Sequence, residues 1–187
     1  MTNKSHRAGS LSPEFALLGF LYGSPCHGYD LHQRLQTELG HVWHVSQSQA
    51  YAILKRLENR GDISVQVVEQ DKLPAKQMLK ITAPGRKRFL DWLENGIGSN
   101  ARSIRLEFLT RLYFIQLYKP ERTAQIYQTQ FDEITSNIQR LKNLQASIPS
   151  NQDYNKLSID LRLRQLKLIQ IWMAEIKTQF HIQEVAS

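Results

Sequence analysis

One helix with unusually clear ends constrains the fold of this chain more than any other sequence feature. Ser46 is followed three residues later by Gln49, which is the spacing of a capping box, so a helix is expected over residues 46–60. Gly61 follows, and glycine often ends a helix because it adopts left-handed backbone angles without strain. Apolar residues recur at helical spacing, so one face is expected to be buried and the other exposed. These apolar residues are Ala50, Ile53, Leu54 and Leu57.

Two short strands are expected directly after this helix. Residues 63–69 (ISVQVVE) are rich in β-branched side chains and partly alternate, and residues 78–82 (MLKIT) read in the same way. The connection between them, residues 70–77, is polar and contains Pro74. The pattern therefore predicts a hairpin of the kind called a wing, with its tip in this connection.

Further helices are expected on both sides of this segment. Ser12 as N-cap and Pro13 as first helical residue predict a helix over residues 12–22, and apolar spacing predicts another over 28–39. A fourth helix is expected after the second strand. The order helix, helix, helix, strand, wing, strand is that of a winged helix-turn-helix, whose third helix enters the major groove of DNA. Residues 1–95 are therefore predicted to form a DNA-binding domain.

The second half of the chain is expected to be helical throughout. Residues 95–103 contain two glycines and little bulk, which indicates a domain boundary. Beyond it, helices are predicted over residues 103–118, 120–147 and 153–182. The predicted fold class is mainly α, with an N-terminal winged helix-turn-helix followed by an all-helical C-terminal dimerisation domain over residues 96–187.

Two of these helices suggest that the chain pairs with a second copy. The helix over residues 120–147 carries apolar residues at alternating spacings of four and three, which form a coiled-coil seam. The last helix is apolar on more than one face, so it is expected to be buried on two sides and to form a homodimer. The candidate dimerisation residues are Tyr127, Phe131, Ile134, Ile138, Leu141, Leu166, Ile169, Trp172 and Ile176.

Composition narrows the class of protein. The chain has 24 Lys and Arg against 17 Asp and Glu, a formal net charge of +7, which suggests an anionic partner. This charge is divided almost evenly between the two halves of the chain. The positions of individual basic residues therefore say more about a binding surface than the total charge does. Cys26 is the single cysteine, which excludes an internal disulfide framework. Neither an apolar run of membrane-spanning length nor a secretory signal is present, so a cytoplasmic protein without a membrane partner is expected.

Three segments resemble the PadR family of bacterial transcriptional regulators. They are LSPEFALLGFLYGSPCHGYDLHQRL, SQSQAYAILKRLENRGDI and LKITAPGRKRFLDWL, which together extend over residues 11 to about 93. The length and the helical second half are similar to the family's larger subgroup. The resemblance implies a homodimer that binds a pseudo-palindromic DNA operator and usually represses transcription.

The resemblance also implies a set of DNA-contacting residues. Hydrogen-bonding side chains on the exposed face of the third helix are expected in the major groove, and basic residues of the wing on the backbone. These residues are Gln47, Ser48, Tyr51, Lys55, Lys72 and Lys76. The sequence departs from the family at residues 76–78, where the family often has Arg and an aromatic residue. It also departs at Asp62, where an apolar residue commonly follows the glycine, and which we interpret as a local turn variation.

Other functions remain open from the sequence. A winged helix with a coiled-coil arm can be a protein-interaction module without DNA affinity. A metal-responsive sensor would need His27, His32, His41 and His44 to converge, and no metal site or cofactor is predicted from their spacing. Tyr113, Tyr118 and Trp172 could line a pocket for a small aromatic effector. No catalytic motif is found, so the chain is not expected to be an enzyme.

Overall fold

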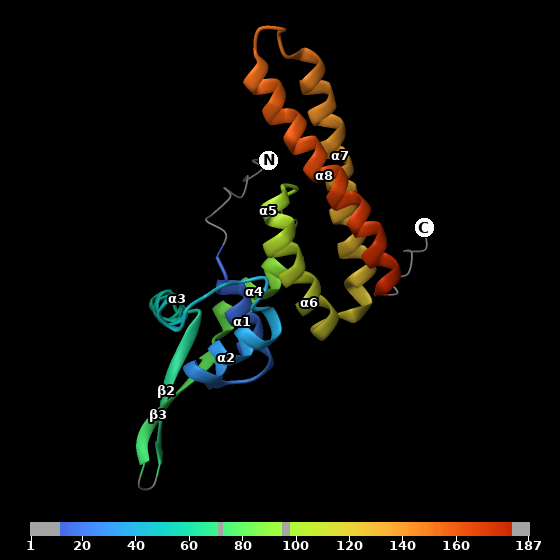
Figure 1. The fold of residues 1–187 in the computed structure, drawn as a ribbon. Coiled ribbons are helices and arrows are strands. Elements are labelled where there is room, and N and C mark those ends of the chain that lie inside the picture. The colour runs from blue at the N-terminus through green and yellow to red at the C-terminus, as the bar shows by residue number, and fades with distance from the viewer. Residues whose placement is uncertain (1–11, 71–72, 95–97, 181–187) are drawn as a thin grey trace, which may run out of the picture. The chain divides into compact units, whose positions relative to one another are not determined.

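The computed structural model describes residues 12–70, 73–94 and 98–180 (Figure 1). The chain forms two compact units, Met1–Asn95 and Gly96–Ser187. Within the described ranges, no helix is long and apolar enough to cross a membrane.

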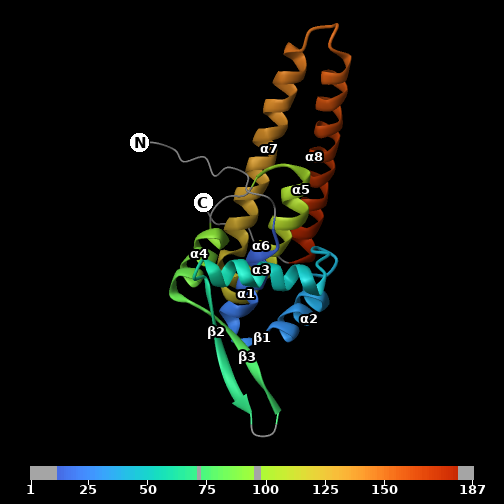
Figure 2. The same cartoon turned by 90° about the vertical axis from the view of Figure 1, so that its left-hand side faces the viewer.

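The first unit is a small helical bundle with a three-stranded antiparallel sheet. The strands lie in the order β1-β3-β2, and β2 and β3 form a long hairpin that projects away from the helices (Figure 2). The elements are α1 (Glu14–Gly23), β1 (Cys26–His27), α2 (Gly28–Leu39), α3 (Gln47–Asn59), β2 (Ile63–Gln70), β3 (Leu73–Ile81) and α4 (Ala83–Glu94).

Local chemistry fixes both ends of α3 as predicted. The Ser46 hydroxyl accepts a hydrogen bond from the backbone N–H of Gln49 (3.3 Å), and the Ser46 N–H donates to Oε1 of Gln49 (2.9 Å), which completes the capping box. Gly61 follows with a φ of 75°, a left-handed angle at which a residue with a side chain would be strained. At α1 the predicted cap is wrong by one residue. Pro13, and not Ser12, is the N-cap, because its carbonyl accepts the first helical bond, from Leu17 N–H.

The hairpin is longer than predicted. Residues 70–77 were expected to form its connection, but β2 extends to Gln70 and β3 begins at Leu73, so only residues 71–72 lie between the strands. Antiparallel pairing depends on backbone groups, so it continues where the side chains become polar. The ladder is irregular between Val68 and Gln70, near Pro74, which has no N–H to donate. The two-residue strand β1 was not predicted at all.

An ion-pair network joins the end of α3 to α1 and α4. Asp62, only 5% exposed, accepts hydrogen bonds from Arg60 (3.0 Å) and Arg88 (2.8 Å), and both arginines also bind Glu14. Burial would raise the pKa of Glu14, but the hydrogen bonds and charges of Arg60 and Arg88 outweigh it and lower that pKa. A Cβ on Gly85 would lie 1.9 Å from the Asp62 carbonyl oxygen, so α4 can approach this turn only through a glycine. Asp62 is thus a buried anchor of the fold and more than a turn variation.

The second unit is entirely helical in its described part. Its elements are α5 (Ala101–Ser103), a π-helical turn η1 (Ile104–Phe108), α6 (Leu109–Tyr118), a 3-10 turn η2 (Pro120–Arg122), α7 (Thr123–Ser147) and α8 (Asp153–Gln179). The continuous α-helix expected over residues 103–118 is therefore interrupted by a π turn. The long helices α7 and α8 lie side by side and are joined at one end, as both ribbon views show.

A buried charge follows the π turn. Arg111 is only 3% exposed, and burial lowers its pKa to about 10. The negative charges of Glu107 and Glu133 raise that pKa, but by less than burial lowers it. Burial raises the pKa of the Glu107 and Glu133 carboxyls, and the positive charge of Arg111 offsets part of this rise. The apolar periodicity of this segment gave no sign of such a group.

The nine candidate dimerisation residues face the interior of this unit. Six are buried in its core, and Phe131, Ile169 and Trp172 pack against that core while partly exposed. Tyr127 also donates a hydrogen bond to the backbone oxygen of Met173 (2.6 Å), which joins α7 to α8. Among the described residues of this unit, the buried side chains of α8 lie on one side of the helix. Its opposite side carries apolar side chains that are each more than half exposed: Tyr154, Leu157, Leu161, Leu168 and Ile171.

Candidate nucleic-acid interface

Helix α3 separates its apolar residues from its polar residues. Ala50, Ile53, Leu54 and Leu57 are buried against the rest of the first unit. The four α3 residues predicted to meet DNA are all exposed; they are Gln47, Ser48, Tyr51 and Lys55. Tyr51 exposes 45% of its surface, although the opposite side of the helix is well packed.

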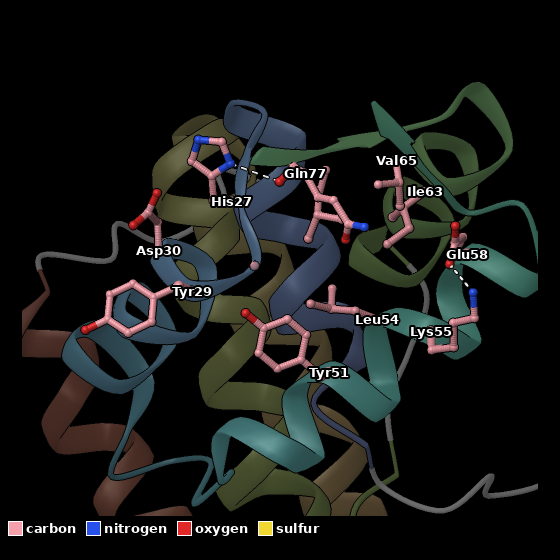
Figure 3. Close-up of a pocket in the computed structure, with 12 residues that line it drawn as sticks. His27, Tyr29, Asp30, Tyr51, Leu54, Lys55, Glu58, Ile63, Val65 and Gln77 are labelled. Atoms are coloured by element: carbon pink, nitrogen blue, oxygen red, sulfur yellow. Dashed lines mark hydrogen bonds and ion pairs between the residues drawn. The ribbon is translucent and has the colours of Figure 1, made fainter. Parts of the chain in front are cut away.

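A groove of about 620 Å³ lies beside this face (Figure 3). Its walls are α3, the first turn of α2 and the strands of the sheet, and Tyr51 and Lys55 both line it. Figure 3 shows the Tyr51 ring projecting from α3 toward the start of α2, with Lys55 further along α3. The groove therefore brings together the start of α2 and the polar face of α3.

The charge of Lys55 is paired within its own helix. Lys55 Nζ lies 2.8 Å from Oε2 of Glu58, one turn later, and the lysine side chain is 69% exposed. An exposed pair of this kind contributes about 0–1 kcal/mol, so another anion can displace Glu58 at little cost. Glu58 therefore orients the Lys55 side chain, but the weak pair can give way to a phosphate or a base edge.

The start of α2 was missed by sequence reasoning as part of this site. His27 and Tyr29 both line the groove. Nδ1 of His27 lies 2.9 Å from the backbone oxygen of Gln77, and β1 pairs His27 with Met78, so this segment is fixed to strand β3. The Tyr29 hydroxyl accepts a hydrogen bond from Gln33 (3.0 Å). A two-residue strand has no periodicity, so no sequence signal could have placed these residues beside α3.

Comparison with known proteins identifies the family of the domain that contains this interface. Residues 17–91 match the transcriptional regulator PadR-like family, and this range contains α2, α3 and the hairpin. The chain therefore contains a PadR-like domain. Members are transcriptional regulators, so the prediction that the chain is a regulator and not an enzyme is confirmed.

A curated relative and several solved structures are similar to this PadR-like chain. The negative transcriptional regulator PadR of Bacillus subtilis (strain 168) is 28% identical over 134 residues, which are 72% of this chain and 71% of that protein. The crystal structure of Bacillus subtilis PadR in complex with operator DNA is 23% identical, with a TM-score of 0.44, over 89% of this chain and 96% of that one. The crystal structure of a PadR-like transcriptional regulator from Bacillus cereus is 23% identical, with a TM-score of 0.43. The match covers 92% of this chain and 99% of that one.

The wing of this PadR-like domain is described only in part. Lys72 lies outside the described residues. Lys76 lies in β3, where its backbone pairs with Val68, and its side chain is outside the described part of the chain. The expected contacts of both lysines with DNA therefore stay predictions.

The four histidines of the metal-sensor alternative do not converge. His27 bonds Gln77, Nε2 of His32 lies 2.9 Å from the backbone oxygen of Val45, and His41 and His44 are exposed. Throughout residues 12–70, 73–94 and 98–180, no three His, Cys, Asp or Glu side chains are grouped so as to hold a metal ion. The geometry therefore gives this alternative no support.

The three candidate effector residues of the PadR-like chain lie in the helical unit. Tyr113 meets the ring of Phe114 edge-on, with centroids 4.9 Å apart, and Tyr118 stacks on the same ring at 5.9 Å. Trp172 is partly buried against the α7–α8 core. None of the three lines the groove beside α3 or the shallow polar cavity along α7. Their role in effector binding stays a prediction.

Proposed function

We propose that this PadR-like regulator binds a specific double-stranded DNA operator with α3 in the major groove and the β2–β3 hairpin along the phosphate backbone. One observation carries the proposal. The exposed face of α3 presents amide, hydroxyl, phenol and ammonium groups, while its opposite face packs on the domain. These are the groups that read base edges and phosphates, and a helix of this kind fits the major groove.

The four side chains of this face take different roles. Gln47 and Ser48 lie in the first turn of α3, where recognition helices meet bases and phosphates. Tyr51 offers a hydroxyl that both donates and accepts hydrogen bonds. Lys55 supplies a positive charge that displaces a counterion from DNA when it leaves Glu58 for a phosphate.

A homodimer is the assembly that this proposal requires. The exposed apolar residues Tyr154, Leu157, Leu161, Leu168 and Ile171 follow spacings of three, four, seven and three along α8, which is the heptad pattern of a helix seam. A second copy would cover this stripe, whereas the seam on α7 is already used inside the chain. Two α3 helices related by a twofold axis would read a pseudo-palindromic operator.

Repression is the proposed direction of control. It is supported by the similarity to the negative regulator PadR of Bacillus subtilis. A small aromatic effector that releases the DNA, bound near Tyr113, Tyr118 and Trp172, is the proposed signal. Titration of small aromatic acids against the fluorescence of wild-type protein and of Trp172→Phe tests this part.

Selection of bound fragments from the source genome tests the proposed function directly. The expected result is enrichment of a short sequence with twofold symmetry. Its affinity should fall steeply with salt, with a log–log slope of several units, because basic residues release counterions from phosphates. Absence of enrichment, together with no measurable affinity for DNA at low salt, would overturn the proposal and favour a protein-interaction module.

A further inference from the structure

Gly28 begins α2 and lies directly against the ring of Tyr51 on α3. A Cβ atom placed on Gly28 would lie 2.9 Å from Cε1 of Tyr51 and 3.3 Å from both Cζ and the hydroxyl oxygen. A Cβ is not found so close to another heavy atom unless one of the two shifts. The ring can therefore rest on the start of α2 only because residue 28 has no side chain.

Glycine is needed here for room and not for backbone conformation. Among the glycines that the structure describes, only Gly61 has a positive φ. Gly28 is the first residue of a regular 12-residue helix, a position that any residue with a helical backbone can occupy. An alanine at residue 28 would therefore fit the backbone, and the three atoms nearest to its Cβ would all belong to the Tyr51 side chain.

The surface on which the ring rests is itself anchored to the hairpin. His27, the preceding residue, pairs with Met78 of β3, and its Nδ1 lies 2.9 Å from the Gln77 oxygen. Figure 3 shows this hydrogen bond at one side of the groove and Tyr51 below it. Tyr51 thus packs on a segment that is bonded to the sheet, although the residue belongs to α3.

We propose that Gly28 is a positioning residue for DNA recognition, because it lets the start of α2 hold the Tyr51 ring in one orientation on the exposed face of α3. This inference rests on the proposed function. A half-exposed tyrosine that is not held would lose rotamer freedom on binding DNA, and that loss would weaken the contact. With the ring already supported, the hydroxyl is presented to a phosphate or base edge in the direction set by α2.

A double-mutant cycle on operator DNA tests the inference. The variants are Gly28→Ala, Tyr51→Ala and the double variant, with affinity measured by fluorescence anisotropy on the selected operator. We expect Gly28→Ala to weaken binding about five- to twentyfold when Tyr51 is present and less than about twofold when Tyr51 is replaced by Ala, because the effect acts through the ring. Equal losses in both backgrounds, or no loss in either, would overturn the inference.

Tyr51→Phe separates the ring from its hydroxyl. It keeps the packing on Gly28 and removes the polar group, so it should lose most of the affinity that Tyr51→Ala loses while the melting temperature stays at the wild-type value. Full wild-type affinity of Tyr51→Phe would show that no positioned hydroxyl is used.

A measurement without DNA separates the inference from the proposed function. The α protons of Gly28 should show a ring-current shift in the NMR spectrum of the wild-type protein, and Tyr51→Ala should abolish it. Loss of the double-mutant coupling with DNA binding intact overturns the positioning role alone. Failure of the wild-type protein to bind any DNA overturns the proposed function, whatever the NMR spectrum shows.

Discussion

The guanidinium of Arg88, on α4, binds the carboxylate of Asp62 at 2.8 Å, immediately after α3. This contact joins residues 26 positions apart and fixes the end of the proposed recognition helix to the helix that follows the hairpin. The second arginine on the same carboxylate is Arg60, the C-cap of α3. A substitution that removes these contacts of Asp62 should therefore make the orientation of α3 less well fixed.

Asp62→Ala should destabilise the first unit strongly. It removes a buried carboxylate and leaves Arg88 with one fewer partner, and hydrogen bonds to charged groups are worth about 1.5–3 kcal/mol. Because Arg60 and Arg88 are partly exposed and keep Glu14, the expected loss of unfolding free energy is about 2–3 kcal/mol. Urea denaturation followed by circular dichroism measures it. Asp91→Ala removes an exposed carboxylate of α4 and is the control, with an expected change within about 0.5 kcal/mol.

Glu14 should make the stability of the first unit depend on pH in the acidic range. Its pKa is lower in the folded protein than the ordinary value of 4.5, so the unfolded chain binds the proton more readily. The stabilisation is therefore complete above about pH 5 and is lost as the pH falls through the folded pKa. Glu14→Gln should flatten the melting temperature against pH below pH 5. A profile that stays parallel to that of the wild-type protein would contradict this role.

Gly61→Ala should destabilise α3 through the backbone alone. Apart from the two neighbouring residues, no described atom lies within 4 Å of a Cβ built at this position, but the φ of 75° is left-handed. The expected cost is about 1–2 kcal/mol, the usual penalty for an L residue in that region. Gly85→Ala is the matched contrast, because its Cβ would overlap the carbonyl oxygen of Asp62 and should cost more. Thermal unfolding of the two variants orders the effects.

Local signals predicted helix α3 and its two ends well, whereas contacts distant in sequence were not predicted. The capping box at Ser46 and the stop at Gly61 both act within a few residues, so the sequence alone locates α3. The winged-helix order follows from the same kind of signal. The pairing of β1 with β3 joins residues about 50 positions apart through a strand of two residues, and apolar spacing cannot detect it.

In the candidate site, too, local features were predictable from the sequence and contacts distant in sequence were not. The exposed face of α3 follows from its apolar pattern, since the four polar residues lie opposite the buried ones. The packing of Tyr51 on Gly28 depends on where α2 begins in space, so only the structure reveals it. In the second unit, the apolar pattern of α8 was interpreted as two-sided burial. A single chain covers one side, and the pattern alone cannot say which apolar residues meet α7.

Lys55→Ala and Tyr51→Ala should each weaken operator binding by about 1–3 kcal/mol without unfolding the protein. Both side chains are exposed, so their loss removes no core contact. Lys55→Ala should also lower the salt slope by about one unit, because one phosphate charge is no longer neutralised. Lys142→Ala, an exposed lysine of α7, is the charge-matched control. Wild-type affinity of both α3 variants would remove this helix from the DNA interface.

Leu168→Glu should dissociate the proposed homodimer while the chain stays folded. Leu168 is 68% exposed in the single chain and belongs to the apolar stripe of α8, so a carboxylate there disturbs no contact of the α7–α8 core. Burial of two such charges against each other at a helix seam is costly, because each would need a partner that the apolar stripe does not offer. Light scattering after gel filtration should give twice the chain mass for the wild-type protein and the single-chain mass for the variant. Lys167→Glu places the same residue one position earlier, outside the stripe, and should stay dimeric. A wild-type protein with the mass of one chain, or a Leu168→Glu variant that stays dimeric, would exclude this face of α8 as the interface.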